Sequence, residues 1–181
     1  DPKSDPCLAL RAAVAAAEFG LPIAPGTLQN LKSCPIDDRT WNDESRSLFL
    51  RLLASGPALL QVWEEIDFVD IPGRLIPEWL AIRNRPSASA AHRYTIDRHS
   101  VEVVTRLGRE TPRGNRYDDR HYQALLLAGI LHDVGKRPGV ADHAAEGARH
   151  ASMVLKRMGF DRDIIWWVTL LVREHLTLSE F

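Results

Sequence analysis

The most apolar stretch of the chain, ALLLAGIL at residues 124–131, runs directly into the sequence HDVGK at residues 132–136. An apolar run of this length, inside a longer periodic segment, predicts a buried central helix. Histidine nitrogen and aspartate oxygen are metal ligands, and a lysine can bind a phosphate as a mobile point charge. This junction therefore predicts a helical core with a metal and phosphate site at the carboxyl end of its central helix.

The rest of the chain also has helical periodicity and no alternating pattern of the kind that predicts strands. Residues 7–19 are rich in Ala and Leu, and Gly20 is suited to end that helix. Asp43 or Ser45 is expected to cap a helix that reaches Leu53. Further helices are predicted over residues 27–32, 58–66, from about 97, about 118–134, about 142–158 and about 161–178. The predicted fold class is all-α.

The chain length of 181 residues suits one compact domain, or a small domain with an appendage. Its hydrophobic fraction of 45% is ordinary for a globular protein, so a sizeable core is available. A loop of small and polar residues at 86–95 separates two groups of predicted helices. We expect a helical extension over residues 1–91 and a compact helical bundle over residues 92–181.

Charge and composition limit the expected partners. The net charge is −1 and no basic run stands out, which argues against nucleic acid. No apolar run approaches the roughly 20 residues that span a bilayer, and the first residues lack the features of a signal peptide. Cys7 and Cys34 form no C-x-x-C motif, and free thiols fit a reducing cytoplasm. Because the chain does not begin with Met, its ends are not expected to be natural boundaries.

Two helices are predicted to turn a histidine toward the interior. His99 follows the spacing of three or four residues that joins Ile96, Val103 and Leu107. In the last predicted helix, His175 lies on the face of the following residues: Ile164, Val168 and Leu171. Taken alone, each is more simply a core histidine that forms a hydrogen bond than a metal ligand.

His143 opens a helix behind Asp142, which is a suitable N-cap. Gly147, one turn later, lets another backbone or a ligand approach that helix. With His132 at the end of the central helix, four helices bring imidazoles toward one region. Several inward imidazoles beside a carboxylate are costly in a small bundle unless they share an ion.

The candidate metal ligands are therefore the following five residues: His99, His132, Asp133, His143 and His175. Mixed nitrogen and oxygen ligands leave Mn, Fe, Zn, Co and Mg open, as one ion or two. Asp133 and Lys136 are the candidate catalytic residues, because Lys136 can neutralise a phosphate oxygen in the transition state. A solvated loop lysine is the alternative for Lys136. The remaining histidines are expected to be surface or structural residues, namely His92, His121 and His150.

Four ordered blocks carry a family resemblance: DRHS with His99, HDVGK, DHAAEGA with His143, and REHLTLS with His175. They resemble the HD superfamily of metal-dependent phosphohydrolases over about residues 92–178. More narrowly, they look like the central domain of the bifunctional PII uridylyltransferase/uridylyl-removing enzymes. The upstream text LFLRLLASGPALLQVWEEIDFVDIPGRLIPEW is similar to the helical segment that precedes that domain. The Ala- and Arg-rich composition indicates a high-GC bacterium, such as an actinobacterium.

The resemblance implies an HD helical bundle and a metal-dependent phosphodiesterase that removes UMP or AMP from a tyrosine of the nitrogen-regulatory PII protein. It also implies flanking nucleotidyltransferase and glutamine-sensing ACT domains in the parent chain. Two departures from the family pattern bear on activity. Glu174 precedes His175 where the family often has His-His, which would alter a second metal site. The last Asp ligand of the superfamily is expected beyond Phe181, so the HD bundle would be truncated at its C-terminus and the isolated chain inactive.

Two other functions remain open from the sequence. The chain could be an HD phosphohydrolase that acts on a free nucleotide. A cyclic dinucleotide substrate is disfavoured, because no G-Y-P motif follows His175. The chain could also be a non-catalytic helical module that regulates its flanking domains or docks PII. Such a module would bind no stoichiometric metal.

Overall fold

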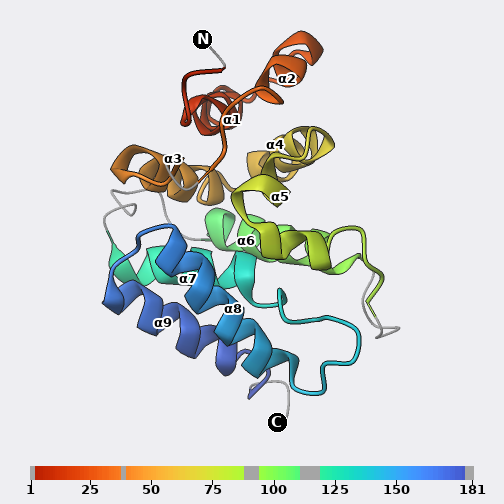
Figure 1. The fold of residues 1–181 in the computed structure, drawn as a ribbon, viewed down its shortest axis with the longest axis vertical. Helices are drawn as coiled ribbons and strands as arrows, with labels where there is room; N and C mark the ends of the chain where they lie inside the picture. Colours follow the sequence, from red (N-terminus) through yellow and green to blue (C-terminus); the bar gives the residue numbers. More distant parts are fainter. Residues whose placement is uncertain (1–2, 38–39, 88–93, 111–118, 178–181) are drawn as a thin grey trace.

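The computed structural model describes residues 3–37, 40–87, 94–110 and 119–177. Within these ranges all regular structure is helical, apart from one isolated antiparallel bridge between Pro86 and Thr95. The all-α prediction is confirmed. Figure 1 shows the elements, which are α1 (Leu8–Phe19), α2 (Pro25–Leu31), α3 (Asp43–Leu53), α4 (Pro57–Phe68), α5 (Ile71–Leu75), the 3-10 helix η2 (Pro77–Ala81), α6 (Ile96–Glu110), α7 (Arg120–Leu131), α8 (His143–Arg157) and α9 (Arg162–Arg173). None of these helices is long and apolar enough to cross a membrane.

Local sequence signals set most helix boundaries. Helix α1 ends where Gly20 adopts a left-handed conformation with φ 62°, as predicted. Helix α3 begins differently from the prediction, because Asn42 is its N-cap. The Asn42 side chain accepts a hydrogen bond from the Ser45 backbone N–H at 3.0 Å, and the Ser45 hydroxyl accepts one from the Asn42 N–H at 2.8 Å. The prediction that Asp43 or Ser45 caps this helix was wrong, since Ser45 is instead the reciprocal partner in a capping box.

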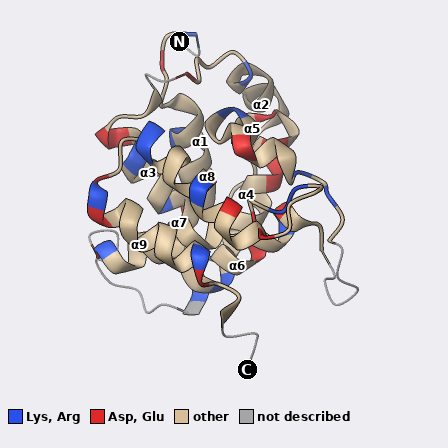
Figure 2. Cartoon of the chain, turned by 60° about the horizontal axis from the view of Figure 1, so that its bottom comes forward, with Lys and Arg blue, Asp and Glu red and all other residues tan. Residues whose placement is uncertain are grey.

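Helices α6 to α9 pack around α7. Helix α6 lies against α7 on one side and α9 lies against α7 on the other, and α8 covers α9. Every residue of α7 from Leu126 to Leu131 is buried, which confirms the central place of this helix. Leu125, just before them, is 39% exposed. Figure 2 shows α7 almost free of charged residues, and Arg120 is the one that its sequence holds.

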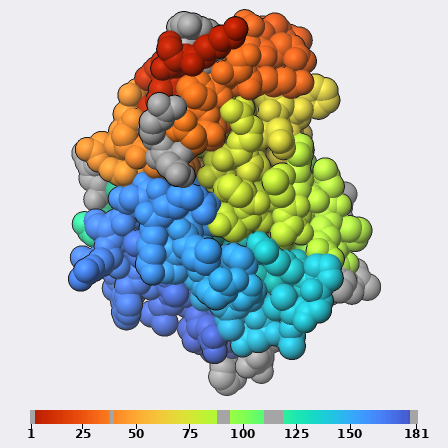
Figure 3. All heavy atoms as spheres, viewed as in Figure 1, coloured from red at the N-terminus to blue at the C-terminus, as the bar shows by residue number. Residues whose placement is uncertain are grey.

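The N-terminal helices sit on this bundle. Helix α4 packs on α6 and α3 packs on α7, and the buried apolar side chains of both parts form one cluster. Figure 3 shows the orange-to-green part of the chain resting on the blue part. Arg157 of α8 also donates two hydrogen bonds to the Glu78 carboxylate of η2, at 3.0 and 2.7 Å. The expected division between residues 91 and 92 lies outside the described residues and stays a prediction.

The structure corrects the two predicted histidine stripes. On α9 the buried face consists of Ile164, Val168 and Val172, whereas Leu171 is 37% exposed. On α6 the core face includes Val101 and Val104, and the residues predicted to share a core stripe with His99, namely Val103 and Leu107, are only half-buried. Both helices are therefore apolar on a second face as well. The boundaries also differ, because α9 ends at Arg173 and α7 at Leu131, so that His175 and His132 lie just past their helices.

Candidate metal centre

His132 is the C-cap residue of α7, and the chain turns immediately after it. Its ring Nδ1 lies 2.8 Å from the carbonyl oxygen of Gly129. A carbonyl only accepts, so Nδ1 carries a proton and Nε2 is the nitrogen that can bind a metal. Nε2 lies 3.4 Å from Oδ2 of Asp133. The end of α7 therefore directs a possible ligand nitrogen toward the neighbouring carboxylate.

A close backbone contact brings α8 to this turn. A Cβ on Gly135 would lie 2.2 Å from the carbonyl oxygen of His143 and 2.3 Å from the backbone nitrogen of Gly147. A Cβ on Gly147 would in turn lie 3.2 Å from the carbonyl oxygen of His132. The expectation that Gly147 admits another backbone is thus confirmed. These two glycines allow the first turn of α8, and with it His143, to lie against the end of α7.

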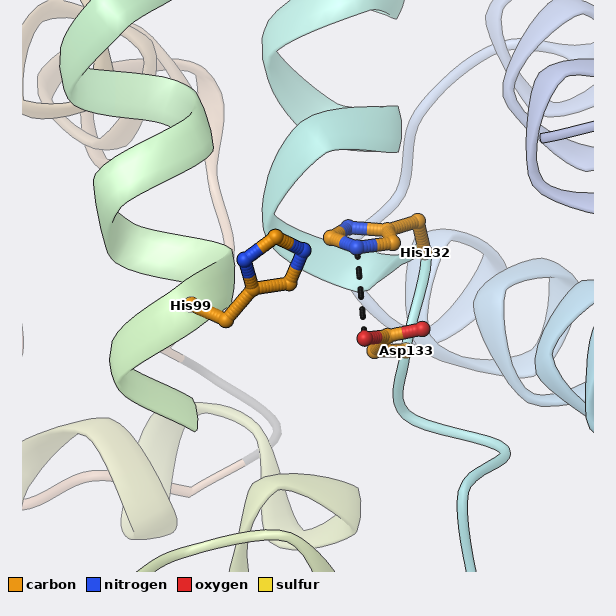
Figure 4. Close-up of side chains that lie close together, drawn as sticks. All are labelled: His99, His132 and Asp133. Carbon is orange, nitrogen blue, oxygen red and sulfur yellow. Dashed lines mark ion pairs between the residues drawn. The ribbon is translucent and has the colours of Figure 1, made fainter. Parts of the chain in front are cut away.

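The predicted ligand residues come together in two groups that share Asp133. In the first, His99, His132 and Asp133 each offer a ligand atom within 4.8 Å of the others. In the second, Asp133, His143 and His175 do the same. Figure 4 shows His99 from α6 and His132 from the end of α7 pointing toward one another, with Asp133 beside them. These side chains come from four helices or their ends and form groups that can hold a metal ion.

Three buried atoms of this cluster have no hydrogen-bond partner among the described residues: Asp133 Oδ1, His143 Nε2 and His175 Nε2. The Asp133 side chain is only 1% exposed, and His175 Nε2 lies 3.6 Å from its Oδ1, beyond hydrogen-bonding distance. His175 Nδ1 is 2.7 Å from the Val172 carbonyl and donates to it, so Nε2 is again the nitrogen that can bind a metal. Unpaired buried polar atoms are costly. A divalent cation would engage all three, so this set of donor atoms fits a metal.

The electrostatics of the cluster favour an ionised carboxylate. Burial by itself would raise the pKa of Asp133, but the neighbouring His132, His175 and Lys136 hold this pKa well below its usual range. Burial, with Lys136 nearby, lowers the pKa of His143. Burial also opposes protonation of His175, but the adjacent Asp133 carboxylate raises its pKa. An anionic Asp133 and unprotonated imidazole nitrogens are the forms that bind metal.

Lys136 lies within the same site. Its Nζ donates a hydrogen bond to Asp133 Oδ2 at 2.8 Å, and its side chain is mostly buried. The alternative of a fully solvated loop lysine is therefore wrong. A cation in this position can interact with a phosphate oxygen that approaches Asp133.

The cluster lies at the inner end of a cleft of about 710 Å³ between α6, α7 and α9. The cleft is lined by His99, Val103, Leu107, Leu125, Ala128, Gly129, His132, Asp133, Lys136, Leu170, Leu171, Glu174, His175 and Leu176. A second cleft of about 460 Å³ borders the cluster through Lys136 and His143. The sequence pattern did not reveal the cleft wall, and several of its apolar residues were predicted to lie in the core. One signal was available: Leu170 and Leu171 are adjacent, about 100° apart on a helix, and cannot share one narrow face.

The other histidines lie apart from the site. His121 is exposed, as predicted. His150 is not a surface residue, because it is 7% exposed within α8 and its Nε2 lies 2.9 Å from Glu146 Oε1. His150 was expected to be either a surface or a structural residue. Since it is buried, the structural role remains. His92 lies outside the described residues.

A family model described as the HD domain matches residues 96–180. This part of the chain belongs to the HD domain family. The match begins at the start of α6 and includes every residue of the two candidate metal groups. The resemblance inferred from the four sequence blocks is confirmed, and so is the helical fold it implied.

The curated relatives extend the similarity to nearly the whole chain. The bifunctional uridylyltransferase/uridylyl-removing enzyme of Streptomyces coelicolor is 40% identical over 181 residues, which is 99% of this chain and 21% of that protein. The enzyme of the same name from Mycobacterium tuberculosis H37Rv is 37% identical over 179 residues, 98% of this chain and 21% of that protein. The one from Corynebacterium glutamicum is 33% identical over 180 residues, 98% of this chain and 25% of that protein. The chain thus spans about a fifth to a quarter of these relatives, all from actinobacteria.

Proposed function

We propose that this chain is the nucleotidyl-removing part of a bifunctional enzyme, a metal-dependent phosphodiesterase that releases UMP or AMP from a tyrosine of the PII protein. The observation that carries the proposal is the buried Asp133 carboxylate shared by two His/Asp groups, with unpartnered ligand atoms at the inner end of a cleft. The names of the relatives, which include a uridylyl-removing activity, favour UMP. The flanking nucleotidyltransferase and ACT domains belong to the same proposal.

His99, His132 and Asp133 would hold the first ion, and His143 and His175 would hold a second ion or orient the diester. A divalent ion among Mn, Mg, Fe, Zn and Co supplies a water of lowered pKa and stabilises charge on the phosphate. Lys136, which contacts Asp133, would turn to a non-bridging phosphate oxygen, because its ammonium group is carried on a flexible stem. Asp133 would stay ionised throughout, since its neighbours lower its pKa.

The leaving group suits a site without a dedicated strong acid. A tyrosine phenolate has a conjugate acid with a pKa of about 10, much lower than that of an alkyl alcohol. Proton donation to the departing oxygen is therefore less necessary than for a serine or ribose ester. The expected products are unmodified PII and a nucleoside monophosphate.

The test uses the full-length parent protein, which would supply the last Asp ligand expected beyond Phe181. It compares the wild type with Asp133→Asn, a change that keeps the shape of the side chain and removes its charge. With added Mn²⁺, the wild type should bind metal stoichiometrically and release UMP from uridylylated PII, and a chelator should stop the release. Asp133→Asn should lose metal and slow the release by at least 100-fold. Asp163→Asn, an exposed carboxylate at the start of α9, is the matched control and should behave as the wild type.

Unchanged release by Asp133→Asn would disprove the mechanism. If the full-length wild type binds no stoichiometric metal and releases no nucleotide, the domain is instead a non-catalytic helical module. Hydrolysis of free nucleotides with no effect on uridylylated PII would point to the other class of HD phosphohydrolase.

A further inference from the structure

We infer that the apolar cleft binds the tyrosine ring of the phosphodiester, whereas the nucleoside lies on the opposite side of the metal centre. This inference rests on the proposed function and adds which end of the substrate enters which cleft. It assigns a role in substrate binding to leucines of the cleft that do not belong to the metal groups.

The cleft has an apolar wall and a polar inner end. Three elements supply the five residues of the wall: Val103 and Leu107 from α6, Leu125 from α7, and Leu170 and Leu171 from α9. Leu125, Leu170 and Leu171 are 39%, 40% and 37% exposed, which is unusual for large aliphatic side chains that gather in one place. The polar residues that line the same cleft are His99, His132, Asp133, Lys136, Glu174 and His175. A ligand with a phosphate at the inner end would therefore place its next group against leucine.

Gly129 keeps this wall close to the metal centre. A Cβ there would lie 3.0 Å from Val104 Cγ2 and 3.1 Å from Leu107 Cδ1. Its absence lets α6 lie tightly against α7, while the Gly129 carbonyl orients the His132 ring. The same residue thus sets the floor of the cleft and the direction of a metal ligand, which fixes the apolar wall next to the reacting phosphate.

The chemistry of the wall selects an aryl group over a nucleobase. The edge of a nucleobase carries several donors and acceptors that lose water on burial and need partners. The five wall residues offer none. The ring of an esterified tyrosine has no polar atom except the bridging oxygen, which belongs to the phosphate end. Burying that ring against leucine is favourable by the hydrophobic effect alone.

The second cleft suits the nucleoside. It adjoins Lys136 and His143. Half of its lining residues are apolar, and the other polar ones are Arg85, Ser87 and Arg137. Two guanidinium groups and a hydroxyl match the hydroxyls and polar base edge of a nucleoside monophosphate. Because the two clefts share Lys136, a phosphodiester beside that residue can extend one arm into each.

The experiment measures binding by calorimetry with the Mn²⁺-loaded chain and three probes: phenyl phosphate, methyl phosphate and UMP. Phenyl phosphate should bind at least about tenfold more tightly than methyl phosphate, as expected for burial of a ring. Leu171→Asn, and independently Leu125→Asn, should reduce this preference to about threefold or less and leave the affinity for UMP unchanged. Met153→Asn, an exposed apolar residue of α8 outside both clefts, is the matched control and should keep the full preference.

Equal affinity for phenyl and methyl phosphate, or no measurable binding of phenyl phosphate, would overturn the inference. So would a preference that survives both leucine substitutions in variants with wild-type circular dichroism. A parallel loss of UMP affinity in these variants would place the base in the apolar cleft and contradict the assignment. A phenyl preference of the chain, together with a full-length protein that releases no nucleotide from uridylylated PII, would uphold the aryl site and reject the proposed function.

Discussion

Asp133 shows how much one side chain determines in this protein. Its Oδ2 is held by Lys136 at 2.8 Å and lies near His132, while its Oδ1 faces His175 without a hydrogen bond. An ionised carboxylate at this depth requires cationic or hydrogen-bonding neighbours. Asp133 therefore belongs to both candidate metal groups, and it is a buried charge that the surrounding residues must stabilise.

His150 permits a prediction at the same scale, away from the metal centre. Burial, with Arg137 and Arg149 nearby, lowers its pKa in the folded protein. The unfolded chain then binds the proton more tightly, so stability falls as pH drops below the unfolded pKa of about 6.5. In the metal-free protein, His150→Gln should weaken the fall in melting temperature between pH 7.5 and pH 5.5. His121→Gln, on the exposed start of α7, should not; an equal effect of both variants would exclude this origin of the pH dependence.

At the scale of elements, the contact between the turn after α7 and the start of α8 assembles the site. Gly135→Ala would place a Cβ against two backbone atoms that cannot rotate away. We expect a loss of stability of about 1–3 kcal/mol together with weakened metal binding, because His143 moves with α8. Gly26→Ala in α2, where a Cβ meets nothing within 4 Å, is the control and should be neutral or slightly stabilising. Thermal melts and Mn²⁺ titrations of both variants test this, and retained metal affinity in Gly135→Ala would contradict it.

The sequence predicted the helices and the five candidate ligands because periodicity and the order of the histidines survive small errors in helix length. It could not separate cleft from core. Leu171 and Val172 are both apolar, and only the packing of α9 on α7 and α8 decides which one is buried. The sequence also did not identify Asn42 as the N-cap of α3. Asp43 and Ser45 are equally suitable N-cap residues, and tertiary contacts decide at which of these neighbouring residues the helix begins. The roles of the five ligands stay predictions until metal binding is measured.

For the whole molecule, the helices before residue 88 act as a cover for the HD domain. Helix α4 packs on α6 with Trp63 and Leu59 buried, and α3 packs on α7. Without these helices, apolar side chains of α6 and α7 would be exposed on that side. The ion pair of Arg157 with Glu78, whose carboxylate is held in its charged form with a lowered pKa, joins the two parts further. A shared hydrophobic cluster and a half-buried ion pair predict one cooperative unit.

Calorimetry should therefore show a single unfolding transition for the chain. Glu78→Gln breaks a pair whose partner is largely buried, and it should destabilise that transition as a whole by about 1–3 kcal/mol. Glu44→Gln, an exposed partner of Arg11, is the control and should cost less than about 1 kcal/mol. If Glu78→Gln split the transition in two, with the metal-binding part melting unchanged, the extension and the HD domain would be independent units. A single shifted transition instead means that the N-terminal helices unfold together with α6, the helix that carries His99.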